Sequence, residues 1–208
     1  MSFPPTNRLQ TNLANLKVTS GSVSETSAGF LTVNHPQVRG VRNGERHARA
    51  RLQFRYQGPS DIRIPSGSGL IFEQIGIQLR AQNTCNVLYI MRQIEPAERV
   101  LVKLKSNPGQ FRHEECENRG YQTLASIPLG LLEITAKDRK FHQLQAAVTL
   151  TEDRCKCSVA TDDRPIWSSE IDFQLISGIS GPAGFRTDNG QFEFQHFVAA
   201  STAQDKQP

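Results

Sequence analysis

Apolar and polar residues alternate one by one along much of the chain, and this period of two constrains the fold more than any other feature. Between residues 48 and 56, Ala, Leu, Phe and Tyr alternate with Arg and Gln. Successive side chains of a β-strand point to opposite faces, so the pattern predicts a strand with one solvated face. Similar runs predict strands at 75–80, 86–92, 100–105, 142–150, 156–161 and 192–199. Helical spacing is almost absent, and residues 128–134 are expected to hold one short helical turn at most.

The predicted strands are short and are separated by turn signals. Gly58-Pro59-Ser60 and the Ser/Gly-rich stretch at 65–69 are of this kind. Many short strands with turns about every ten residues indicate an all-β fold, an antiparallel β-sandwich of the jelly-roll type. A length of 208 residues suits one such domain. We expect the domain to span 11–200, between flexible tails at 1–10 and 201–208.

The composition indicates a soluble globular protein, with 37% hydrophobic and 21% charged residues. No apolar run approaches the roughly 18 residues that span a bilayer, so no membrane association is predicted. Residues 1–15 lack the apolar segment of a signal peptide. The default expectation is a cytoplasmic protein, or an extracellular one if a leader has been removed.

Charge is distributed unevenly. Residues 1–112 hold fifteen Lys/Arg and six Asp/Glu, whereas residues 113–208 hold nine and fourteen. The densest basic run has six arginines, Arg39, Arg42, Arg46, Arg49, Arg51 and Arg55. Clustered Arg attracts anionic polymers. The alternative is that the acidic half folds against the basic half, because a sandwich interleaves distant strands. Without an aromatic ladder beside these arginines, no specific nucleic-acid partner is predicted.

Four cysteines, Cys85, Cys116, Cys155 and Cys157, allow three complete pairings. One residue separates Cys155 from Cys157, which is too few for a zinc site, and on a strand both face the same side. Cys85 and Cys116 lie beside polar turn residues. They are expected to pair in an oxidising compartment and to remain small buried thiols in a reducing one.

The last third of the chain resembles concanavalin A-like and laminin-G-like domains. Residues 142–148 are similar to the strand that precedes a hairpin in these domains. Residues 157–161, the Asp162-Asp163-Arg164 turn and Pro165-Ile166-Trp167 resemble the hairpin itself, and residues 181–197 resemble the closing pair of strands. The resemblance implies a lectin-like sandwich. The sequence differs from the family at Gln195-His196, where the family often has Asp-Asn. Independently, Asn189-Gly190 is a tight-turn signal, and Phe192, Phe194 and His196 share one strand face.

Some proteins with this fold are enzymes, so we compared the sequence with their catalytic motifs. Family β-glucanases carry Glu-x-Asp-x-x-Glu, and here Glu170 and Asp172 are followed by Leu175 where the acid/base belongs. A retaining glycosidase needs both carboxylates. Polysaccharide lyases need Arg or Gln with Tyr or His, and those residue types occur without a lyase signature. The chain is therefore expected not to be an enzyme, with a lyase or glycosidase as the third alternative.

Residues His113–Cys116 and Glu117 form an acidic cluster in a predicted loop. Such a cluster is capable of binding calcium, but acidic residues in a turn are more often simply solvated. No cofactor is predicted, with calcium as the alternative.

The stretch from residue 80 to residue 121 is the predicted binding surface. Its amides and guanidinium groups suit sugar hydroxyls and carboxylates, and tyrosine stacks on pyranose rings. Alternation puts Tyr89 on the opposite strand face from Arg92, so Tyr89 is either a core or a surface residue. Trp167 is either a stacking platform or, more commonly for a lone Trp, a core residue. The predicted binding residues are Arg80, Tyr89, Arg92, Lys103, Lys105, His113 and Arg119.

From these residues we predict a non-catalytic module that binds carbohydrate, in particular an acidic polysaccharide. The alternative is a protein-interaction or structural domain, which would show no dependence on sugar. The sequence does not specify the oligomeric state.

Overall fold

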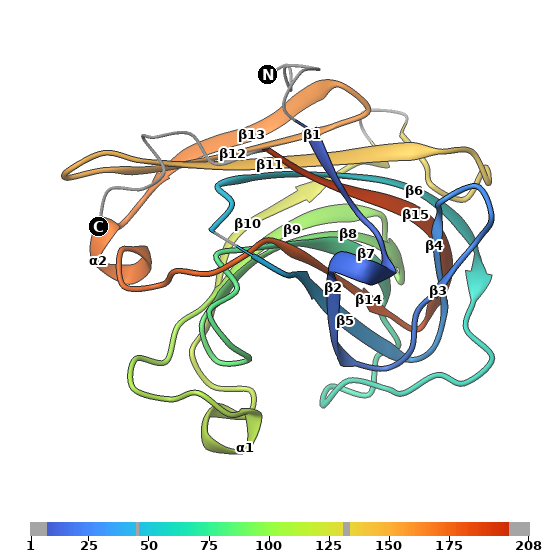
Figure 1. The fold of residues 1–208 in the computed structure, drawn as a ribbon, viewed down its shortest axis with the longest axis horizontal. Helices are drawn as coiled ribbons and strands as arrows, with labels where there is room; N and C mark the ends of the chain where they lie inside the picture. The colour runs from blue at the N-terminus through green and yellow to red at the C-terminus, as the bar shows by residue number, and fades with distance from the viewer. Residues whose placement is uncertain (1–7, 45, 131–133, 200–208) are drawn as a thin grey trace.

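The computed structural model describes residues 8–44, 46–130 and 134–199 as two antiparallel sheets packed face to face (Figure 1). This confirms the predicted sandwich. Among these residues no helix is long and apolar enough to span a bilayer. Sheet A has the strand order β13-β12-β11-β6-β15-β4-β3, with β1 also paired to β15. Its strands are β1 (Arg8–Thr11), β3 (Ser24–Glu25), β4 (Leu31–Asn34), β6 (Arg49–Pro59), β11 (His142–Leu150), β12 (Cys155–Thr161), β13 (Arg164–Ile171) and β15 (Gly190–Ala199).

Sheet B has the strand order β10-β9-β8-β7-β14-β5-β2. Its strands are β2 (Leu16–Ser20), β5 (Gln37–Arg42), β7 (Glu73–Leu79), β8 (Val87–Glu95), β9 (Arg99–Lys105), β10 (Tyr121–Pro128) and β14 (Gly184–Asp188). The helical elements whose residues are all described are a 3₁₀ turn at Leu13–Asn15 and two single turns, α1 (His113–Cys116) and α2 (Phe173–Ile176). The helical turn predicted at 128–134 falls partly on 131–133, outside the described residues, and Pro128 itself ends β10.

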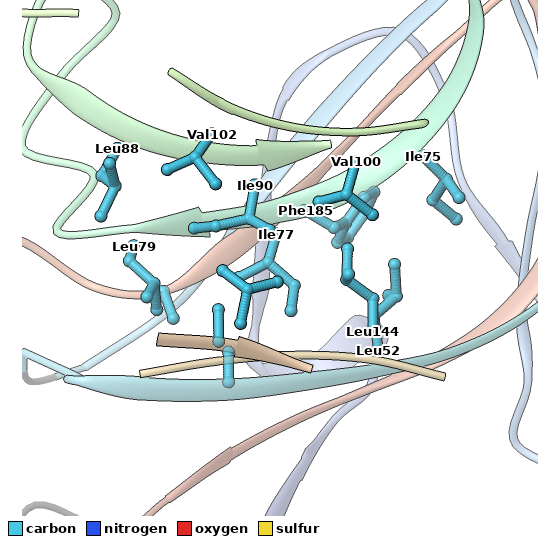
Figure 2. Close-up of a cluster of buried hydrophobic side chains, with 14 of the residues drawn as sticks. Leu52, Ile75, Ile77, Leu79, Leu88, Ile90, Val100, Val102, Leu144 and Phe185 are labelled. Carbon is cyan, nitrogen blue, oxygen red and sulfur yellow. The ribbon is translucent and has the colours of Figure 1, made fainter. Parts of the chain in front are cut away.

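The core lies between the sheets, where every second side chain of each strand points inward. Leu52 of β6 and Leu144 of β11 meet Ile77 of β7, Ile90 of β8 and Phe185 of β14 (Figure 2). All five are 0% exposed. Burial of such side chains is the main stabilising contribution to a sandwich. The layer of inward residues also fixes which side chains of each sheet face outward.

The resemblance to a hairpin at 157–167 is confirmed: β12 and β13 are joined by Asp162 and Asp163, both with positive φ. Trp167 is partly buried and packs on the core. The closing strands are also present, but the turn predicted at Asn189-Gly190 has a different role. β14 belongs to sheet B and β15 to sheet A, so Asn189, with φ 53°, carries the chain from one sheet to the other.

Part of the stretch predicted as an N-terminal tail is a strand. Residues 8–10 belong to β1, which pairs with β15 through Thr11 and His196 among others; the rest of that tail and residues 201–208 lie outside the described residues. The uneven charge is partly balanced in space, as the alternative reading expected. β6, from the basic half, lies between β15 and β11 of the acidic half, and Arg55 pairs with Glu193.

Candidate binding surface on the outer face of sheet B

The outer face of sheet B is built from the residues that alternate with its core residues. In β14, Phe185 points into the core, so Arg186 points outward, beside Arg39 of β5 and Gly76 of β7. In β8, Ile90 points inward and Tyr89 outward, opposite Lys103 of β9. The central residues of this face are Arg39, Val41, Gln74, Gln78, Val87, Tyr89, Met91, Lys103, Lys105, Tyr121, Arg186 and Asp188.

The outer face contains a small apolar cluster of its own. Ala81, Val87, Tyr89, Met91 and Leu101 are buried together on it. This second cluster explains why β8 is apolar on both faces. Tyr89 is therefore a buried residue of the outer face, with 4% exposure, rather than part of the main core.

Arg186 and Asp188 form the polar centre of the face. The Arg186 guanidinium donates to both carboxylate oxygens of Asp188, at 2.8 and 3.1 Å, and Gln74 Nε2 donates to the same carboxylate at 2.6 Å. Arg186 also covers the Tyr89 ring, with Cζ 5.2 Å from the ring centroid. Burial alone would lower the pKa of Arg186, but the Asp188 carboxylate raises it above its ordinary value. Arg186 is thus a fixed, permanently charged group.

Tyr121 is the accessible aromatic residue beside this centre. Its ring stacks on Tyr89 with centroids 6.3 Å apart, and it is 39% exposed. Lys105 Nζ lies 5.1 Å from the Tyr121 ring centroid and donates to the carbonyl oxygens of Thr84 and Glu117, at 3.1 and 2.7 Å. These two contacts fix the position of the partly exposed ring.

The centre of the face carries an excess of positive charge. Arg39 and Arg186 lie close enough to Lys105 to affect its pKa, and Arg186 likewise affects Lys103, while the Asp188 carboxylate already accepts three hydrogen bonds. Burial, followed by the charges of Arg39 and Arg186, lowers the pKa of Lys105 to about 8. Burial and Arg186 also lower the pKa of Lys103. Arg39 Nε is buried without a hydrogen-bond partner among the described residues. Such crowding of cations favours an anionic group above them.

Two loops flank the face on the side of sheet B away from sheet A (Figure 1). One spans 106–120, includes α1, and is fixed by the Cys85–Cys116 disulfide, which corresponds to the first of the two alternatives left open by the sequence. The other spans 60–72. It is held by Asn189, whose side chain accepts from the backbone of Ile64 and donates to the carbonyls of Ile64 and Phe72.

The structure brings three of the predicted residues together on this side of sheet B: Tyr89, Lys103 and Lys105. Only Lys103 is partly exposed, because Tyr89 and Lys105 are 4% and 1% exposed, so the prediction that Lys105 is a surface residue is wrong. The prediction that Arg92 is a surface residue is wrong. Arg92 points to the interior, is 1% exposed, and donates from Nη2 to Glu98 at 3.1 Å. Arg80 does not lie with Tyr89 and Lys103 either; its Nε donates a hydrogen bond to the Ile179 carbonyl oxygen.

His113 and Arg119 belong to the flanking loop 106–120 rather than to the face, and both are exposed. Arg119 donates to the Glu115 carbonyl oxygen. The sequence did not point to Gln74, Arg186 and Asp188 as site residues, because they come from strands far apart in the chain. The available signal was the alternation of Arg186 and Asp188 around the buried Thr187.

Two surface hollows lie elsewhere. One, of about 290 Å³, is lined by Arg55, Gln57 and Arg139. The other, of about 410 Å³, lies at the end of the sandwich and is lined by Tyr56, Pro59, Arg63, Ile71, Glu73, Glu95 and Pro96.

Three solved structures have the same architecture at low sequence identity. The carbohydrate-binding module CBM66 from Bacillus subtilis is 12% identical, with 86% of this chain and 91% of that chain covered and a TM-score of 0.55. Peanut lectin is 8% identical, with 94% and 98% covered and a TM-score of 0.55. The carbohydrate recognition domain of Emp46p is 11% identical, with 90% and 88% covered and a TM-score of 0.54. This is a concanavalin A-like sandwich. No protein-family model and no curated protein sequence matches the chain.

Within this concanavalin A-like sandwich, the incomplete glucanase motif serves local structure. Glu170 is exposed and accepts from Arg154 Nη1 at 3.4 Å. The Asp172 side chain caps α2 by accepting from the backbone N–H of Gln174 at 2.9 Å. The two carboxylates therefore have separate structural partners.

The acidic side chains of loop 106–120 do not come together to form a metal site. The Glu115 carboxylate accepts the backbone N–H groups of Phe111 and Arg112, and Cys116 is in the disulfide. Among the described residues of the concanavalin A-like sandwich, no group of three or more His, Cys, Asp and Glu side chains is placed to hold a metal ion.

Proposed function

We propose that this chain is a non-catalytic module that binds carbohydrate on the outer face of sheet B, and that its ligand is an acidic polysaccharide. One observation carries the proposal: the accessible Tyr121 ring, stacked on Tyr89, lies among the cations Arg39, Lys103, Lys105 and Arg186. An aromatic ring stacks on the apolar side of a sugar. Lys and Arg bind its carboxylate or sulfate groups through charge-assisted hydrogen bonds.

The solved structures with this fold support the proposal in general terms, since one is a carbohydrate-binding module and another a carbohydrate recognition domain. The proposal of an acidic ligand rests on the side chains of the outer face of sheet B. Its aromatic and cationic groups are held in place by neighbouring side chains and carbonyls before a ligand arrives. Preorganisation of this kind reduces the entropy lost on binding.

The test is titration calorimetry with acidic and neutral polysaccharides, using Lys103→Ala and Tyr121→Ala. Each substitution should weaken binding of the acidic polymer about tenfold, the effect of losing one charge-assisted or stacking contact. Lys156→Ala is the matched control, because Lys156 is an exposed lysine on sheet A. Binding should persist in EDTA, since the proposed site uses no metal, and the polymer should keep its length after incubation.

A second candidate function, a protein-interaction domain, is favoured by the loop 60–72. Ile62, Ile64 and Leu70 are 67%, 47% and 49% exposed there. Clustered exposed apolar side chains are typical of protein interfaces. Failure of every polysaccharide to bind, or equal binding by wild type and both variants, would remove the carbohydrate proposal and favour this second candidate.

A further inference from the structure

The outer face of sheet A, on the opposite side of the molecule, carries a row of glutamines. Gln53 of β6 is the Cα partner of both Gln143 of β11 and Gln195 of β15. Their chain neighbours Leu52, Leu144 and Phe194 are buried in the core, so the three amides point outward. All three side chains are partly exposed. We call these residues the amide row.

The amide row has unused hydrogen-bonding capacity. Among the described residues, the side chains of Gln53 and Gln195 make no hydrogen bond, and Gln143 Oε1 accepts only from Gln145 Nε2, at 3.4 Å. Each amide offers two donors and an acceptor with two lone pairs. Three adjacent strands set these groups about 4.8 Å apart, which is close to the length of one sugar ring in an extended chain.

The next row of the same face contains buried polar atoms without partners. Arg51 of β6 and Gln145 of β11 are Cα partners. Gln145 is 3% exposed, and its Oε1 has no hydrogen-bond partner among the described residues; the same holds for Arg51 Nε. Buried polar groups in native proteins are nearly always hydrogen-bonded. Their unsatisfied state beside the amide row indicates that a ligand supplies the missing partners.

An aromatic pair lies at the edge of the amide row. The Phe30 and Phe141 rings are 5.1 Å apart, Phe141 is 38% exposed, and Arg55 Cζ lies 4.8 Å from the Phe141 centroid. The hollow lined by Arg55, Gln57 and Arg139 adjoins it. Arg55, two residues from Gln53 on β6, is paired with Glu193, whereas Arg51 lies at the same distance along β6 on the other side of Gln53.

We infer that the outer face of sheet A is a second binding surface, whose ligand is an uncharged, hydroxyl-rich polymer such as a neutral glycan chain. Neutral amides match hydroxyl groups, which both donate and accept hydrogen bonds, and the exposed phenyl ring stacks on the apolar side of a sugar. This surface lies on the other side of the sandwich from the outer face of sheet B. The inference is therefore independent of the acidic-polysaccharide proposal.

The test is electrophoresis of the full chain through native gels containing a neutral β-glucan, xylan or galactomannan. The running buffer contains added salt, because salt screens contacts between exposed charges. At least one polymer should retard the wild-type chain. Gln53→Ala/Gln195→Ala should raise the dissociation constant about tenfold, as expected for the loss of two neutral hydrogen bonds, and Phe141→Ala should also raise it. Lys103→Ala, on sheet B, should bind like wild type.

Gln191→Ala is the matched control, because Gln191 lies on the same face but outside the amide row, donating to Asp61 at 3.2 Å. Thermal unfolding checks that each variant is folded, and Gln53→Glu provides a second test that preserves side-chain size. Absence of retardation by every neutral polymer would overturn the inference, as would retardation that the double variant and Gln53→Glu leave unchanged. Sedimentation that shows a wild-type dimer, dissolved by the double variant, would overturn it as well, since the face would then bind a second copy.

Discussion

Arg186 and Asp188 are two positions apart on β14, and the guanidinium of one donates to both carboxylate oxygens of the other. Their side chains are only 17% and 6% exposed. The pair therefore holds a buried carboxylate in place and simultaneously covers Tyr89.

Replacing Arg186 with Ala should destabilise the protein markedly. Asp188 would keep only the hydrogen bond from Gln74 and remain a buried charge without a countercharge in contact. Removing one partner of such a pair costs about 3 kcal/mol of unfolding free energy. Urea unfolding measures the effect. Arg49→Ala, an exposed arginine on sheet A, is the control and should change stability by about 0.5 kcal/mol or less. Equal stability of the two variants would show that the pair is not a structural element.

Binding of an acidic polysaccharide should weaken as the pH rises through about 8. The pKa of Lys105 is lowered to about 8, so its side chain is an ammonium below that pH and a neutral amine above it. An anionic ligand favours the ammonium form. Calorimetry with a sulfated polysaccharide, whose charge is constant in this range, should show about a fivefold loss of affinity between pH 7 and 9.5. Lys105→Met should bind more weakly at pH 7 and show a flatter profile; a wild-type profile as flat as that of the variant would contradict the prediction.

Acid should destabilise the fold through His196. Burial, together with the charges of His47 and Arg42, lowers the pKa of this imidazole to about 3, while Thr11 Oγ1 lies 2.9 Å from its Nδ1. The unfolded imidazole titrates near pH 6.5, so between pH 6.5 and 3 the unfolded chain binds a proton that the folded chain does not. The contribution of His196 to the free energy of unfolding is therefore fully present above about pH 6.5 and decreases as the pH falls toward 3.

The loss should amount to about 2 kcal/mol of unfolding free energy between pH 6.5 and 5. His196→Gln should be less sensitive to acid, because Gln takes up no proton. Urea unfolding of both proteins at the two pH values gives the comparison. An identical pH dependence would mean that carboxylates alone account for the effect.

Thiol titration should separate the four cysteines into two classes. Cys85 and Cys116 are disulfide-bonded, whereas Cys155 and Cys157 are buried free thiols. Protein purified under oxidising conditions should therefore show two reactive thiols after unfolding and four after reduction. Burial raises the pKa of Cys155 to about 11 and that of Cys157 to about 12, so neither should react in the folded protein at pH 8. Four thiols before reduction would show that the disulfide is not formed.

Opening the disulfide should also lower stability. A crosslink that closes a loop of this length, with a sequence separation of 31, stabilises a protein by up to about 4 kcal/mol. Cys85→Ser/Cys116→Ser should lose about that amount, and hydrogen exchange should quicken mainly in loop 106–120. Faster exchange spread evenly over both sheets would contradict a local role.

The period-two pattern was sufficient to predict the strands whose two faces differ. β6 and β15 are of this kind, and Phe192, Phe194 and His196 share one face of β15 as predicted; the structure shows that this face points inward. β8 is different, because Val87–Glu95 is apolar on both faces. Alternation separated Tyr89 from Arg92 but contained nothing to say which of them faces the core, and Arg92 was assigned to the wrong side.

The candidate site could be predicted only where it lies within one hairpin. Tyr89 and Lys103 are neighbours across β8 and β9, which are consecutive in the chain. Arg39, Gln74 and Arg186 join them through β5, β7 and β14, and this strand order follows from long-range pairing rather than from local residue preference. The amide row was missed for the same reason.

The position of β15 in sheet A has a consequence for synthesis of the protein. This strand pairs with β6 along most of its length and, on its other side, with β4 and then β1. Sheet A therefore lacks one of its inner strands until residues 190–199 have left the ribosome. β1 cannot pair before then, because its partner strand is synthesised almost 190 residues later. A nascent chain shorter than this exposes the edges of β6 and β4, which are sites for mispairing with other chains. Cells making this protein would have to shield those edges until translation of the domain ends.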